Sequence, residues 1–259
     1  MERSSPPRLG QRTVSVALLP ERLDWADHTW SDPDGGQIIL HGVLPTVVYP
    51  RSMRPRIEWH GLALLEAPDV VDMWVQEEKD EAESPGVNLA HGLISGGAMA
   101  IYLDEISLVE DVTSGRFPDP EPRRLHRNAE RHQRPVYFVE PTADDERWSE
   151  HLTNEAKAAS HWKKLLGMIS LGGKWRKRVK KNIFLAQKPP KGVSPNFGSA
   201  AVLSTTWWDL NEWIVGEPVV EARDQRYAER LRGALADLRI THGSDAVLLL
   251  PLFLPHRNA

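Results

Sequence analysis

Residues 246–254, AVLLLPLFL, are the longest apolar run of the chain, and they follow a segment, residues 222–238 (ARDQRYAERLRGALADL), with helical periodicity. A short apolar run bounded by a proline is typical of a buried β-strand, and the preceding pattern is typical of an amphipathic α-helix. Nine residues interrupted by Pro251 are too few to span a bilayer. The end of the chain therefore predicts that helix and strand share one core.

The sequence as a whole predicts an α+β protein with a strand-rich N-terminal part and a more helical C-terminal part in one compact body. We expect a flexible tail over 1–11, a strand-rich lobe over 12–112, a linker or long loop over 113–135, and a mixed helix and strand lobe over 136–259. Apolar runs between turn signals predict strands over 14–19, 37–49, 57–65, 136–139 and 200–204.

Helical spacing predicts helices over 69–81 and 207–213, and a longer one from Thr142. Thr142 and Asp145 fit a capping box, and an apolar stripe continues from Trp148 to Leu166, with Gly167 or Gly172-Gly173 as its end. The segment 98–109 fits either a strand or a buried helix.

The composition removes several classes of function. The 259 residues include no cysteine, which excludes disulfides, thiol nucleophiles and thiolate zinc sites. A formal net charge of −4 gives no sign of overall basicity. No secretory signal is visible, so we expect a cytoplasmic protein without a transmembrane segment. The chain has 22 arginines and 10 lysines, and such a preference for arginine is typical of proteins from a GC-rich bacterial or phage genome.

The charge is strongly segregated along the chain. Residues 156–208 contain no Asp or Glu but hold nine of the ten lysines and two arginines, a total of +11. The other 206 residues carry 21 basic and 36 acidic groups, a balance of −15. In a chain that otherwise relies on arginine for positive charge, this bias marks the basic segment 156–208 as the candidate functional region.

The centre of that segment, KWRKRVKKNI (174–183), predicts a helix with a narrow inward seam formed by Trp175, Val179, Ile183 and Ala186. Its like charges repel one another, so an anion that covers them should stabilise it. We take nine residues as the candidate nucleic-acid-binding set: Lys163, Lys164, Lys174, Trp175, Arg176, Lys177, Arg178, Lys180 and Lys181.

Several anions could meet this segment. Nucleic acid fits because lysines neutralise phosphates, and Trp162 and Trp175 could stack on unpaired bases. An acidic partner protein, an anionic membrane surface and pairing with this chain's own acidic remainder stay open. The leading hypothesis is a non-catalytic nucleic-acid-binding subunit of a bacterial or phage assembly, for DNA or RNA. The alternative is a structural or oligomeric protein, such as a phage particle component, that docks the segment on an acidic neighbour.

Catalytic signals are weaker. Asp104 and Glu105 in an apolar segment suggest a second alternative, a metal-dependent nuclease. The run from Arg123 to Arg134 contains five arginines with His126 and His132, and it predicts a second basic surface more than a metal site, because a cation would be repelled there. No nucleotide or serine-hydrolase motif is complete. We expect no cofactor and no metal, and a protein that is not an enzyme.

Overall fold

The structure, a computed structural model, describes residues 23–142, 144–253 and 256–257. Its strands are β1 (Leu23–Asp24), β2 (His28–Ser31), β3 (Gln37–Gly42), β4 (Gly61–Leu64), β5 (Val136–Phe138), β6 (Val247–Leu252) and β7 (His256–Arg257). Its helices are α1 (Val70–Glu83), α2 (Val87–Ile94), α3 (Gly97–Ser107), α4 (Pro120–Arg131), α5 (Glu146–Ala159), α6 (Trp162–Ile169), α7 (Leu171–Ile183), α8 (Asn196–Val215) and α9 (Glu217–His242), with short 3-10 turns at Arg51–Met53 and Gly243–Asp245.

The main sheet has five strands in the order β2-β3-β6-β4-β5. β2 is antiparallel to β3, and the other four strands run parallel to one another. β6 inserts between β3 and β4, so that Leu249 lies in register with Ile39 on one side and Leu62 on the other. The strand β6 is thus the central strand of the main sheet, which explains its unbroken apolar character.

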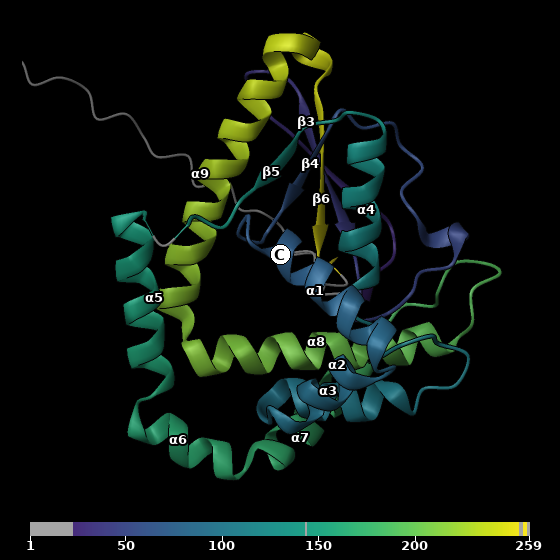
Figure 1. The fold of residues 1–259 in the computed structure, drawn as a ribbon. Coiled ribbons are helices and arrows are strands. Elements are labelled where there is room, and N and C mark those ends of the chain that lie inside the picture. The colour runs from purple at the N-terminus through teal and green to yellow at the C-terminus, as the bar shows by residue number, and fades with distance from the viewer. Residues whose placement is uncertain (1–22, 143, 254–255, 258–259) are drawn as a thin grey trace, which may run out of the picture.

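Helices cover both faces of this sheet (Figure 1). Leu248 and Leu250 of β6 pack on one face against Leu235 of α9, while Leu249 packs on the other face with Leu125 of α4 and residues of α1. Successive side chains of a strand point to opposite faces, so each helix layer meets alternate residues of the same strand.

The turn between β2 and β3 contacts α9 closely. Gly35 and Gly36 adopt positive φ, and a Cβ on Gly36 would lie 3.0 Å from Leu235 and 3.2 Å from the carbonyl of Ala246. Asp32 accepts a hydrogen bond from Arg239 of α9 at 3.2 Å. Glycine is therefore required at positions 35 and 36 by both the backbone angle and the available space.

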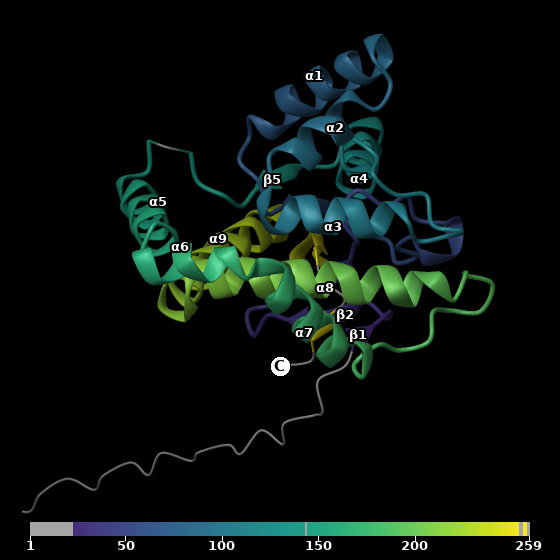
Figure 2. The same ribbon diagram turned by 90° about the horizontal axis from the view of Figure 1, so that it is seen from below.

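A second core lies where the parallel strands end. Leu44 and Val47, which follow β3, pack with Tyr102 and Ile106 of α3 and with Leu203 of α8. Figure 1 shows α8 running across the end of the sheet toward which β6 points, and Figure 2 shows α3 lying along α8. The helical layer therefore closes the edge of the sheet that holds ligands in many α/β folds.

The α+β class is confirmed, with the sheet built mainly from the N-terminal part and most helices in the C-terminal part. Strands 37–49 and 57–65 are shorter than predicted, and strand 14–19 lies outside the described residues. The helix predicted over 69–81 and the final helix and strand are confirmed.

Three expectations were wrong. The strand predicted over 200–204 is part of α8, whose residues Ala200–Thr206 are all buried; a fully buried apolar run gives the same sequence signal in either conformation. The helix predicted from Thr142 begins at Glu146 with Asp145 as its N-cap, and it ends at Ala159 before α6 starts. The segment 113–135 contains a regular helix, α4.

We expect Leu249→Ala to lower the free energy of unfolding by about 2–5 kcal/mol, because it opens a cavity between β3, β4 and the α1–α4 layer. Leu249 is fully buried. Leu108→Ala is the matched control; this side chain is 75% exposed, so the change should stay within about 0.5 kcal/mol. Denaturant unfolding measures both, and equal effects would contradict the central position of β6.

Candidate nucleic-acid interface

The helix α7 is held by one buried face against α8. Trp175 is 1% exposed and Leu171 is 8% exposed. The buried amide of Asn182 donates hydrogen bonds to Thr206 Oγ1 and Asp209 Oδ2 of α8, each at 3.1 Å. Asn182 is buried on this inward face, whereas Ile183 is 55% exposed. The predicted inward seam is therefore correct at Trp175 and wrong at Ile183.

Five of the predicted cations face solvent from α6 and α7. We define the basic surface by these exposed side chains: Lys163, Arg176, Lys177, Lys180 and Lys181. Across the part of the chain that the structure describes, no carboxylate oxygen lies within 4.0 Å of a nitrogen of any of them. The described acidic remainder of the chain therefore does not neutralise this surface.

The other three cations are partly buried around one aromatic ring. Lys164, Lys174 and Arg178 lie 4.6, 5.0 and 5.7 Å from the ring centroid of Trp213 in α8. The ammonium of Lys164 also donates a hydrogen bond to the Trp213 carbonyl, and burial followed by repulsion from Arg178 lowers the pKa of Lys164. These side chains attach α6 and α7 to α8 and contribute less to the outer surface.

The two tryptophans of this region have different roles. Trp175 is buried, so it packs α7 on α8 and cannot reach a nucleic-acid base, in contrast to the expected binding role. Trp162, at the start of α6, is 61% exposed, with the ammonium of Lys163 5.6 Å from its ring. Of these two tryptophans, Trp162 is the one exposed enough to stack on a base.

An apolar stripe is exposed on α6. Trp162, Leu165, Leu166 and Ile169 follow helical spacing, and 50% to 83% of each side chain is exposed. The sequence pattern placed Leu166 on the inward stripe of one long helix, but the break at Ser160 and His161 turns α6 outward. The side of α6 that faces α8 instead carries Lys164 and Gly167. A Cβ added to Gly167 would lie 2.7 Å from the ring of Trp213, so glycine is needed at this position.

The carboxylate pair proposed for a nuclease lies on a helix. Asp104 and Glu105 belong to α3, with Asp104 exposed and Glu105 half-buried. Within the described ranges, no group of three or more His, Asp or Glu side chains is arranged to hold a metal ion. This placement gives the nuclease alternative no support.

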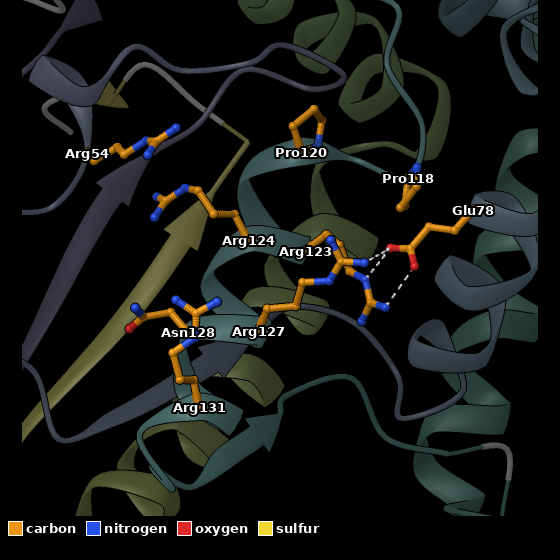
Figure 3. A pocket seen from close by; sticks show the side chains of 9 residues that line it. All are labelled: Arg54, Glu78, Pro118, Pro120, Arg123, Arg124, Arg127, Asn128 and Arg131. Carbon is orange, nitrogen blue, oxygen red and sulfur yellow. Dashed lines mark hydrogen bonds and ion pairs between the residues drawn. The ribbon is translucent and has the colours of Figure 1, made fainter. Parts of the chain in front are cut away.

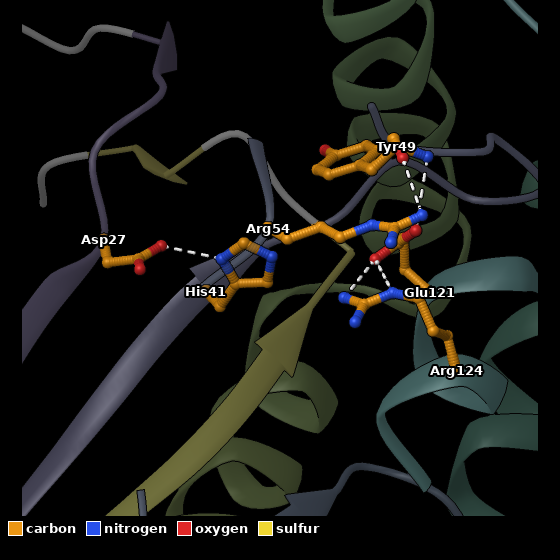
Figure 4. Close-up of polar contacts among 6 residues, drawn as sticks. All are labelled: Asp27, His41, Tyr49, Arg54, Glu121 and Arg124. Carbon is orange, nitrogen blue, oxygen red and sulfur yellow. Dashed lines mark hydrogen bonds and ion pairs between the residues drawn. The ribbon is translucent and has the colours of Figure 1, made fainter. Parts of the chain in front are cut away.

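Sequence reasoning missed a polar cluster at the end of β3 (Figure 4). His41 is 3% exposed, and its Nδ1 lies 2.7 Å from Asp27 Oδ1. Glu121, at the start of α4, accepts from the backbone N–H of Tyr49 at 3.2 Å and from Arg124 at 2.6 and 2.9 Å. The Nε2 atom of His41 is buried and has no hydrogen-bond partner among the described residues.

Two more carboxyl groups lie near this end of the sheet. Burial raises the pKa of Asp119 to about 8, although backbone hydrogen bonds from Thr46 and Glu121 oppose the shift. Burial, with repulsion from Glu140 and Asp69, raises the pKa of Glu66 to about 7. Glu66 lies two residues after the end of the buried strand β4, and that position was the one signal in the sequence that could have identified it.

Stability should therefore fall as the pH rises from about 4 to about 8, because the folded protein retains protons on Asp119 and Glu66 that the unfolded chain has already released. We expect Asp119→Asn to make this fall less steep, by up to about 1.4 kcal/mol per pH unit. Denaturant unfolding across this range measures it, with the exposed Asp72→Asn as control. An identical slope in wild type and Asp119→Asn would contradict a buried, protonated Asp119.

Comparisons with protein-family models, with curated proteins and with solved structures find no match to this chain. Among the helices of the described residues, none has both the length and the apolar character needed to cross a membrane.

Proposed function

We propose that this protein is a non-catalytic nucleic-acid-binding subunit of a bacterial or phage assembly, which holds phosphates on the basic surface of α6 and α7. The observation that carries the proposal is the set of exposed cations, Lys163 to Lys181, without a carboxylate within ion-pair distance among the described residues. The cytoplasmic location belongs to the same proposal.

Electrostatics favours a phosphate backbone as the partner. Arg176, Lys177, Lys180 and Lys181 lie within six residues of one helix, where like charges three or four positions apart destabilise it. A phosphate chain relieves that repulsion, and it releases its condensed counterions when lysines replace them. The binding should therefore depend steeply on salt and little on sequence.

The exposed Trp162 adds a second element of recognition. Its ring lies on the same α6–α7 unit as the cations, with Lys163 beside it. Aromatic stacking on an unpaired base contributes about 1–3 kcal/mol and tolerates any base. Single-stranded DNA or RNA is therefore the substrate class that uses both features.

The double variant Lys177→Gln/Lys181→Gln should weaken binding of a fluorescent single-stranded oligonucleotide, as measured by anisotropy. Each lost phosphate contact should reduce the slope of log K against log salt by about 0.7, a total of about 1.4. The matched control is Lys79→Gln, which changes the lysine outside the basic segment, on the acidic helix α1. Binding that is absent in low salt, or that does not respond to salt, would contradict the proposal.

The exposed stripe of α6 favours a second candidate function, a structural or oligomeric interaction protein. An apolar centre of Trp162, Leu165, Leu166 and Ile169 beside a rim of lysines has the anatomy of a protein interface. A second copy of the chain could supply an acidic counterpart, since residues outside the basic segment carry −15. Nucleic acid alone would leave the leucines and Ile169 exposed.

If α6 joins two copies, the wild-type protein should run as a dimer or larger assembly in size exclusion with light scattering. Leu165→Ser/Ile169→Ser should then dissociate it, because both changed side chains are at least half exposed and contribute little to the fold of one copy. Leu108→Ser, on a different exposed surface, is the control. A monomeric wild type across the accessible concentration range excludes self-association through this stripe.

A further inference from the structure

A pocket of about 720 Å³ lies between α4, α1 and the segment that follows Arg51–Met53. Five of its lining residues are arginines, from two separate parts of the chain (Figure 3). Its lining consists of Arg54, Glu78, Pro118, Pro120, Arg123, Arg124, Arg127, Asn128 and Arg131. A volume of this size is in the range that holds small-molecule ligands.

The arginines of α4 line the pocket because of their spacing. Arg123, Arg127 and Arg131 recur every four residues, and Arg124 and Asn128 fill the adjacent row. Side chains three and four residues apart share one face of a helix. Leu125 and Ala129 of α4 pack against the sheet, and the buried Arg123 lies over the ring of Trp74 in α1, whereas Arg127 and Arg131 are exposed. The second basic surface expected from the sequence is thus the wall of a pocket.

Two carboxylates hold three of these guanidinium groups in place. Glu78 of α1 accepts from Arg123 at 2.7 and 3.2 Å and from Arg127 at 2.8 Å. Glu121 accepts from Arg124, and only 1% of its side chain is exposed. Planar groups that are fixed before a ligand arrives lose less conformational entropy on binding.

The remaining two arginines have no carboxylate within ion-pair distance among the described residues. Arg54 donates only a long hydrogen bond, 3.4 Å, to the carbonyl of Tyr49, and its buried Nε has no partner there. Arg131 is exposed at the end of α4. Five arginines against Glu78 and Glu121 leave a charge of +3 around the pocket.

We propose that this pocket binds a small molecule with two or more linked phosphoryl groups. A guanidinium presents paired N–H donors that match phosphate oxygens, and two or three uncompensated guanidinium charges call for more than one phosphoryl group. Among the described residues, no aromatic side chain lines the pocket, so the phosphates and not a stacked ring supply the recognition. The proposal assigns the ligand class and leaves the rest of the molecule open.

This site is separate from the basic surface on which the proposed function rests. The pocket uses arginines of α4 and Arg54, whereas the basic surface uses side chains of α6 and α7. Both views place α4 away from α6 (Figures 1 and 2), and in Figure 1 α8 lies between them. Each site can be removed without touching the other.

Titration calorimetry of the full chain with inorganic pyrophosphate tests the proposal, with orthophosphate and citrate as comparison ligands at equal ionic strength. We expect pyrophosphate to bind more tightly than either. Arg54→Gln and Arg131→Gln should each weaken it about tenfold or more, because each removes a charge-assisted contact but no ion pair of the fold. Arg51→Gln, an exposed arginine close in sequence that does not line the pocket, should leave the affinity unchanged.

Absence of pyrophosphate binding at low ionic strength would overturn the assignment, as would citrate binding at least as tightly as pyrophosphate. Unchanged affinity in both pocket variants would overturn it as well, provided that their thermal unfolding matches wild type. Lys177→Gln/Lys181→Gln should reduce oligonucleotide binding and leave pyrophosphate binding unaffected. Failure of the pocket and failure of the basic surface therefore give different results.

Discussion

The burial of α8 is the constraint on which the arrangement of this protein depends. Nine residues of this 20-residue helix are buried, and α3, α5, α7 and α9 all pack against it. Small side chains such as Ala200, Ala201 and Ser204 let the neighbouring helices approach closely. Because α8 also crosses the end of the parallel sheet, it connects the sheet to the helices that carry the cations.

The orientation of α7 follows from that packing. One face of α7, with Trp175 and Asn182, is buried against α8. Lys164, Lys174 and Arg178 lie around the ring of Trp213, so the remaining cations of α6 and α7 point toward solvent. The cations that are clustered in the sequence are thus also clustered on one surface of the folded protein, formed by α6 and α7. On the far side, α4 concentrates arginines around a pocket that Glu78 and Glu121 hold in shape. The two basic regions differ in residue type, element and geometry.

The fold class, the helix α9 and the strand β6 could be predicted, because helical periodicity and an apolar run in the sequence indicate local burial directly. The strand predicted at 200–204 failed because residues of α8 are buried on several sides, which hides the helical period. The cations were identified by composition alone, but which of them face solvent depends on Trp213 in α8, which is distant in the sequence from Lys164, Lys174 and Arg178. His41, Asp119 and Glu121 gave no local signal, because their partners are brought together only by the sheet.

The central claim is that the exposed cations of α7 have no carboxylate within ion-pair distance among the residues that the structure describes, and that they repel one another. Amide hydrogen exchange of α7 at about 0.01 M and about 1 M sodium chloride tests it, since the Debye length falls from roughly 30 Å to roughly 3 Å. Unpaired like charges predict slower exchange in α7 at high salt, as screening relieves the repulsion. Faster exchange at high salt would show that screening breaks favourable ion pairs, and it would contradict the account.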